Sequence, residues 1–162
     1  VKHLQIITTG GTIDKIYYDV KSDYRIRTPE IARILTDMNV AFRWHVQPLL
    51  RKDSLEMNDA DRDLVRRAVE AADSTHFLIT HGTDSMVQTA HALGDPGDRV
   101  IVMTGALNPA RFIDSDAVFN IGCAVGAVQA LPPGVWIVMN GRVWNPDFVR
   151  KNRDANRFEA LR

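Results

Sequence analysis

The sequence has a single cysteine, Cys123, and no excess of charge of either sign. One cysteine excludes a disulfide within the chain and suits a reducing compartment, so we expect a cytoplasmic protein. Twenty Lys and Arg residues balance twenty Asp and Glu residues, and this balance offers no electrostatic surface to a nucleic acid or an anionic membrane. The longest apolar stretches, such as 123–131, are too short to span a bilayer, and no signal-peptide pattern opens the chain. We therefore expect neither a nucleic acid nor a membrane among its partners.

The composition that remains is that of an ordinary globular domain. Hydrophobic residues make up 45% of the 162 residues and charged residues 25%, with no repeat, low-complexity tract or linker. A chain of this length can bury a substantial core in one unit. We expect one domain over residues 1–162.

Short apolar runs alternate along the chain with helical patterns. They predict strands at residues 3–9, 42–50, 76–80, 99–104 and 135–139, and helices near 28–38, 58–72, 85–93 and 116–131. Thr28 and Asn58 are the expected caps of the first two helices. The tail, residues 141–149, is predicted as a hairpin that turns at Asn145-Pro146-Asp147. Alternating strands and helices imply right-handed βαβ units, and hence an α/β fold with a mostly parallel sheet and helices on both faces.

The helical periodicity also predicts which side chains face the core. The expected inward positions are Ile31, Ile34, Leu35, Met38, Leu64, Ala68, Ala72, Val118, Ile121, Val125 and Val128. The one segment without periodicity is Asp14 to Arg27, after the first strand. Because long loops at the carboxyl end of a strand usually serve a function, we interpret this segment as a lid over a ligand site.

Glycines and short polar residues follow the predicted strands. These segments are Thr9-Gly10-Gly11-Thr12, Asp53-Ser54, His81-Gly82-Thr83-Asp84 and Gly105-Ala106. Because the carboxyl ends of parallel strands share one edge of the sheet, we expect the segments to meet there. Glycines let backbone N–H groups approach a ligand closely, and a helix start such as Thr83-Asp84 favours a carboxylate or a developing oxyanion.

Each motif alone has a structural alternative, because Gly-Gly is a common turn and Thr after Gly is a common helix cap. Gly10-Gly11-Thr12 lacks the third glycine of a dinucleotide fingerprint, and the sequence has no Gly-Lys-Ser/Thr phosphate loop. The histidines are scattered without the spacing of metal ligands, so we expect no metal site.

In combination, the segments resemble the bacterial-type L-asparaginases. The resemblance rests on Thr9-Gly10-Gly11-Thr12-Ile13 followed by His81-Gly82-Thr83-Asp84-Ser85-Met86. Further segments fall in the family's order: Asp53-Ser54 with Met57-Asn58-Asp59, Thr104-Gly105-Ala106, Asp116 with Phe119-Asn120, and Val149-Arg150-Lys151-Asn152. The resemblance covers the chain from Leu4 to about Arg157. It implies a Rossmann-like three-layer sandwich resembling the family's N-terminal domain.

The resemblance also implies roles for individual residues. Thr12 is expected to be the nucleophile that attacks a side-chain amide carbon and forms an acyl-enzyme, with Tyr24 of the lid beside it. Thr83, Asp84 and Lys151 are expected to form a second triad, in which Lys151 accepts a proton through the Thr83 hydroxyl. The backbone N–H groups of Thr12 and Thr83 are the expected oxyanion donors. The expected substrate-binding residues are Gly11, Ser54, Gly82, Thr83, Asp84 and Ala106, and no cofactor is expected.

The activity implied by the resemblance is the hydrolysis of L-asparagine to L-aspartate and ammonia. Two alternatives stay open: a non-catalytic amino-acid-binding or regulatory protein of the same fold, and an amidase for another amide such as glutamine. Lys151 favours an enzyme, because a binding protein has no use for a lysine aimed at a threonine hydroxyl.

The sequence departs from the family pattern at two points. Leu55 stands where many family members have a polar residue that contacts the substrate's amino group. The family chain usually continues into a second, smaller domain that supplies a carboxylate to a neighbouring subunit, whereas this sequence ends at Arg162. We therefore expect a homodimer or homotetramer in which a polar or acidic residue of the partner takes the place of that carboxylate.

Overall fold

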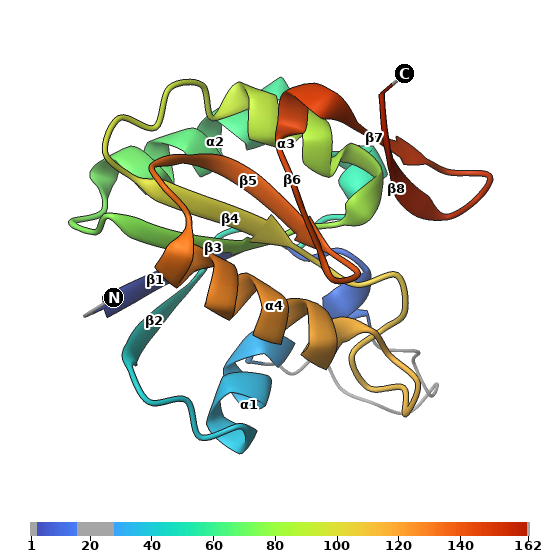
Figure 1. Cartoon of the computed structure of the whole chain (residues 1–162), viewed down its shortest axis with the longest axis horizontal. Helices are drawn as coiled ribbons and strands as arrows, with labels where there is room; N and C mark the ends of the chain where they lie inside the picture. The colour runs from blue at the N-terminus through green and yellow to red at the C-terminus, as the bar shows by residue number, and fades with distance from the viewer. Residues whose placement is uncertain (1–2, 16–27, 162) are drawn as a thin grey trace.

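The computed structural model describes residues 3–15 and 28–161 (Figure 1). The described part is built on a six-stranded sheet with the order β2-β1-β3-β4-β5-β6, in which the first five strands are parallel and β6 is antiparallel. The strands of this sheet are β1 (His3–Thr8), β2 (Arg43–Pro48), β3 (His76–Thr80), β4 (Val100–Thr104), β5 (Gly134–Met139) and β6 (Arg142–Trp144). The helices are α1 (Glu30–Asp37), α2 (Asp59–Ala71), α3 (Met86–Ala92) and α4 (Ala117–Ala130). Of these helices, none has the length and apolar character that crossing a bilayer requires.

Helices cover both faces of the sheet (Figure 1). The helices α1 and α4 pack on one face, and α2 and α3 pack on the other. Because strand side chains alternate, Leu78 of β3 belongs to the first core, whereas its neighbours Phe77 and Ile79 belong to the second. Since both faces are covered, the central strands are apolar almost throughout. This arrangement confirms the predicted fold class, a mostly parallel α/β sheet between two helical layers.

One connection breaks the expected handedness. Strands β3, β4 and β5 succeed one another in the same direction across the sheet, yet α3 packs on one face and α4 on the opposite face. Two crossovers in the same direction over opposite faces have opposite hands, so the expectation of right-handed units throughout is wrong. The physical reason is coverage: α1 has only eight residues, and without α4 the rest of its face would lie open to water.

The inward faces of three helices differ from the predicted positions. Met38, Leu64 and Val118 are 57%, 41% and 42% exposed. Met38 lies beyond the last turn of α1, and the buried stripes of α2 and α4 begin one residue away from those predicted, at Val65 and Ala117. Apolar residues are frequent in these helices. Periodicity alone therefore does not decide which of two adjacent positions faces the core.

The two predicted helix caps have different outcomes. Asn58 caps α2 as predicted, in a capping box with Asp61. Thr28 does not cap α1, because the N–H of Glu30 donates instead to Oδ1 of Asp14 at 2.9 Å. The cap therefore comes from a carboxylate distant in the sequence, which a local cap motif cannot reveal.

The predicted hairpin at 141–149 is wrong in its turn and in its partners. The strand β6 pairs with β5 through a turn at Asn140-Gly141, and Pro146 begins a short 3₁₀ turn, Pro146–Phe148. The chain then forms a second, separate hairpin of β7 (Val149–Asn152) and β8 (Arg157–Ala160). The asparagine at 140 adopts a positive φ of 50°, which makes Asn-Gly the stronger turn signal of the two.

Candidate active site

The candidate site lies at the carboxyl ends of the parallel strands, at the point where the order of the strands reverses. The strands β1 and β3 are neighbours, but β1 connects onward to β2 on one side and β3 to β4 on the other. This order, 2-1-3-4-5, creates a switch point, and ligands of open α/β sheets bind in the crevice at such points. The segments with Thr12 and Thr83 follow these two strands directly. The topology therefore places both threonine motifs at one edge of the sheet, beside this switch point, as predicted.

Glycines allow the strand-end segments to touch. Gly11 has a φ of +90°, and a Cβ built on it would lie 2.5 Å from the backbone nitrogen of Gly82. A Cβ on Gly82 would in turn lie 2.6 Å from both Cβ and Oγ of Ser54. Both distances are too short for a side chain. Because Thr12 and Thr83 each follow one of the touching glycines, the contact brings the segments of the two threonines together.

We predict that Gly82→Ala destabilises the protein, because its φ of −64° suits alanine but the new methyl group would collide with Ser54. Overpacking of this kind costs about 1–3 kcal/mol, which would lower the urea midpoint of unfolding. The matched control is Gly126→Ala in α4, where nothing lies within 4 Å of the added Cβ. There we expect a gain of about 0.5–1 kcal/mol from helix propensity. Equal midpoints for the two variants would contradict the proposed close contact.

Lys151 reaches the site from the hairpin β7–β8. Its Nζ donates to Oγ1 of Thr83 at 3.0 Å and to Oδ1 of Asn156 at 2.8 Å, and it lies 5.6 Å from the centre of the Phe158 ring. Burial lowers the pKa of Lys151 below its ordinary value; Asp84 and Asp116 act against this shift, and Arg153 acts with it. A lysine with a lowered pKa in contact with a hydroxyl is suited to accept a proton from it.

Ser54 lies against Gly82, and Asp84 follows Gly82 by two residues in the chain. Their substrate-binding roles stay predictions. Ser54 is 3% exposed, and its carbonyl oxygen accepts a hydrogen bond from the Ser85 hydroxyl. Asp84 is half-buried, directly after Thr83 in the 3₁₀ turn Thr83–Ser85. Ser54 and Asp84 therefore lie on two segments that meet at Gly82.

Ala106 is held in place by a polar network at the start of α4. The Asp116 carboxylate accepts from the backbone N–H of Leu107 at 3.0 Å. Asn120 is fully buried, and its Nδ2 donates to the Gly105 carbonyl at 2.9 Å and to Asp116 at 2.8 Å. Residues on both sides of Ala106 are therefore fixed by side chains of one helix.

His81 is fully buried beneath the Gly82 segment. Since the Gly82 carbonyl can only accept, Nδ1 of His81 carries the hydrogen of their 2.7 Å contact. Nε2 then accepts from the Thr89 hydroxyl at 2.8 Å. Burial lowers the pKa of His81 to about 4, so the imidazole is neutral at physiological pH. This neutral form is the one that both hydrogen bonds require.

The buried His81 makes stability depend on pH. Between pH 6.5 and about 4 the unfolded chain binds a proton here that the folded chain does not. The contribution of His81 to the free energy of unfolding is therefore complete above pH 6.5. It falls by about 3 kcal/mol in total as the pH drops to about 4. We predict that urea unfolding of His81→Gln lacks this part of the pH dependence, although the variant is less stable at pH 7. An unchanged slope of unfolding free energy against pH would contradict this assignment.

Comparison with known proteins decides the family. A sequence model of the family described as "Asparaginase, N-terminal" matches residues 3–162. The chain belongs to the asparaginase family. It is 29% identical over 175 aligned positions to "L-asparaginase 2" of Escherichia coli (strain K12), covering 98% of this chain and 49% of that one. It is 32% identical over 103 positions to "Glutaminase-asparaginase" of Pseudomonas fluorescens biotype A, covering 59% of this chain and 27% of that one.

A solved structure of an asparaginase shares the fold. "The thermostable L-asparaginase from Thermococcus kodakarensis" superposes with a TM-score of 0.86 at 24% identity, over 98% of this chain and 51% of that one. This asparaginase-family chain therefore spans at most about half the length of the relatives it matches.

The lid and Tyr24 lie mostly outside the described residues of this asparaginase-family chain. Of the segment 14–27, only Asp14 and Lys15 are described. Asp14 caps α1, and Nζ of Lys15 forms an ion pair with Oδ2 of Asp53 at 2.8 Å. The position of Tyr24 beside Thr12 stays a prediction.

Two polar side chains near Lys151 were not anticipated from the sequence. Asn156 holds the Lys151 amine, and Nε of Arg153 lies 4.0 Å from Oδ1 of Asp84. Both belong to the turn between β7 and β8, and Asn156 has a positive φ of 47°. The only signal was an asparagine in a polar turn after Lys151, which is common in turns without any function.

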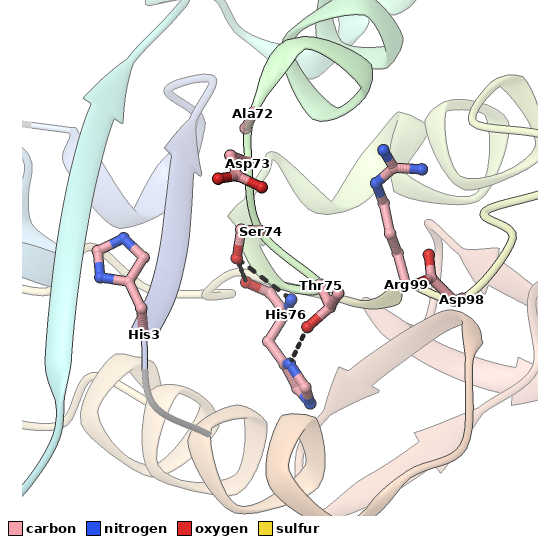
Figure 2. Close-up of a pocket in the computed structure, with 8 residues that line it drawn as sticks. All are labelled: His3, Ala72, Asp73, Ser74, Thr75, His76, Asp98 and Arg99. Carbon is pink, nitrogen blue, oxygen red and sulfur yellow. Dashed lines mark hydrogen bonds between the residues drawn. The ribbon is translucent and has the colours of Figure 1, made fainter.

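A hollow of about 530 Å³ lies elsewhere on this asparaginase-family fold (Figure 2). It is lined by residues at the amino ends of the strands, among them His3, His76 and Arg99. It therefore opens at the edge of the sheet opposite to the threonine motifs, and it takes no part in the candidate site. Among the residues that the structure describes, no group of three or more His, Cys, Asp or Glu could hold a metal ion.

Proposed function

We propose that this chain carries the catalytic groups of an amidohydrolase that converts L-asparagine and water to L-aspartate and ammonia. The observation that carries the proposal is the 3.0 Å hydrogen bond between Lys151 and Thr83, together with the lowered pKa of Lys151. A lysine of this kind serves proton transfer, whereas a binding protein gains nothing from it. The names of relatives, "L-asparaginase 2" among them, support the same substrate.

The proposed reaction has two steps. The Thr12 hydroxyl attacks the side-chain amide carbon, ammonia leaves, and an ester to Thr12 remains. Water then attacks the ester, aspartate leaves, and the Thr12 hydroxyl is restored. Lys151 accepts a proton through the Thr83 hydroxyl, and the backbone N–H groups of Thr12 and Thr83 donate to the oxyanion. Tyr24 is proposed to contact Thr12 from the lid.

Substrate recognition is proposed to use opposite charges held close together. The Ser54 hydroxyl, the backbone at Gly11, Gly82 and Ala106, and the start of the turn at Thr83 would hold the α-carboxylate. The Asp84 carboxylate would face the α-ammonium group. No cofactor enters this scheme.

The experiment that tests the proposal is an ammonia-release assay on the purified protein with asparagine and glutamine as substrates. Release from asparagine is expected. Release from glutamine alone would favour the alternative activity, that of an amidase for another amide such as glutamine. The name "Glutaminase-asparaginase" of one relative is the observation that supports this alternative. Binding of aspartate without turnover of either amide would favour the amino-acid-binding protein.

We also propose that the chain works in the cytoplasm as a homodimer or homotetramer. The single cysteine supports the compartment. Exposed apolar side chains support the assembly: Ile113 is completely exposed and Phe112 is 46% exposed, both on the loop that follows Ala106. We predict sedimentation as a dimer or tetramer at micromolar concentration. A fully active monomer would contradict this prediction.

A further inference from the structure

Asp84 has a cationic neighbour that the proposed reaction does not use. Nε of Arg153 lies 4.0 Å from Oδ1 of Asp84. The Arg153 side chain is 58% exposed and that of Asp84 is 32% exposed. The pair is therefore accessible from solvent, so a substrate that binds at Asp84 would meet Arg153.

Asp84 already has a cationic partner in Arg153. The charge of Asp84 also acts on Lys151, whose pKa it raises, although burial lowers that pKa overall. Lys151 is held in place by Thr83 and Asn156, so it cannot withdraw without losing two hydrogen bonds. An ammonium group brought to Asp84 would meet the guanidinium of Arg153 as a like charge, or would have to displace it. Either event weakens the binding of a cationic group.

The segment that contains Ser54 offers no side chain at position 55 that could bind an ammonium group in place of Asp84. Leu55 follows Ser54 directly in the 3₁₀ turn Ser54–Glu56, and it is 57% exposed. A leucine provides no hydrogen-bond acceptor for an ammonium group. Arg153 and Leu55 therefore act in the same sense, because one repels an α-ammonium group and the other cannot bind it.

We propose that Arg153 is a specificity-determining residue, which shifts preference from free α-amino acids toward monoamides of dicarboxylic acids without an α-ammonium group. This inference rests on the proposed function, in which Asp84 faces the substrate. The guanidinium can pair with a carboxylate of such a substrate, whereas it competes with the ammonium group of asparagine. The reaction is otherwise unchanged: water and the amide give the acid and ammonia.

The test compares asparagine with succinamate, which is the same molecule without the amino group. The variant is Arg153→Gln, and the matched control is Arg157→Gln on the same hairpin, whose Nε lies 3.5 Å from Glu159. For Arg153→Gln we expect kcat/KM for asparagine relative to succinamate to rise about two- to fivefold, the effect of an exposed ion pair. Because any change in the Lys151 pKa affects both substrates alike, the ratio isolates substrate charge. An unchanged ratio, or an equal rise in the control, would overturn the proposal.

A binding measurement separates this inference from the proposed function. Calorimetry with L-aspartate and succinate, the two products, needs no turnover. If the wild-type protein hydrolyses neither amide, the proposed function fails, but a Kd ratio that moves toward aspartate in Arg153→Gln still supports the role of Arg153. A ratio that stays constant, or binding of neither product to the wild-type protein, would overturn that role.

Discussion

Replacing Thr12 with alanine is expected to abolish hydrolysis of asparagine. The proposed nucleophile is the Thr12 hydroxyl, and no other group in the scheme forms the ester, so the loss should reach about 10⁴-fold or more in kcat. The fold should survive, because Thr12 is partly exposed in a short turn. The measurement is ammonia release, with circular dichroism and the urea midpoint to confirm folding.

Thr12→Ser provides the matched control. It keeps the hydroxyl and removes only a methyl group, so it should retain a substantial part of the activity. Mass spectrometry of the acid-quenched wild-type protein should detect the ester at Thr12, and Thr12→Ala should lack it. Near-normal turnover by Thr12→Ala would assign the nucleophile elsewhere.

Replacing Thr83 with valine should lower kcat by about 10²–10⁴-fold, the range of a lost general acid–base group. The change keeps the shape of the side chain and removes the oxygen that Lys151 contacts at 3.0 Å. Because Thr83 and Lys151 act as one unit in the scheme, adding Lys151→Met to Thr83→Val should cost little more. Fully multiplicative losses would show that the two residues act separately.

The pH profile gives a second readout for this pair. Lys151 must be unprotonated to accept a proton, so kcat should fall as the pH drops through its pKa. Burial lowers that pKa below the ordinary value for a lysine, and the acid limb of the wild-type profile should therefore lie at a lower pH than an ordinary lysine would give. The residual activity of Lys151→Met should lack this limb. A limb that persists in the variant would belong to another group.

Much of the fold could be predicted from the chain alone. The strand at 76–80 begins and ends as predicted, because β3 is covered on both faces and reads as a continuous apolar run. The cap at Asn58 was equally clear, since its hydrogen bonds are local. The cap of α1 could not be predicted, because its acceptor, Asp14, lies 16 residues from Glu30. A contact of that kind exists only after the chain has folded.

The candidate site, like the fold, could be predicted from the sequence only in part. The two threonine motifs were visible in sequence because the glycines that allow close contact adjoin the threonines. The contacts of Arg153 and Asn156 could not be predicted from the sequence, because arginine and asparagine are ordinary residues in an exposed turn. Only the pairing of β7 with β8 turns Arg153 toward Asp84 and Asn156 toward Lys151.

The sequence by itself determined the α/β class, the positions of the central strands and the family of this protein, because each depends on local patterns of apolar residues, glycines and threonines. The tertiary structure decided the opposite hand of the β4-α4-β5 crossover, the contact of Gly11 with Gly82, and the approach of Lys151 to Thr83. Each of these joins segments distant in the chain. Their geometry follows from which helix covers which face of the sheet, and no local pattern specifies that choice.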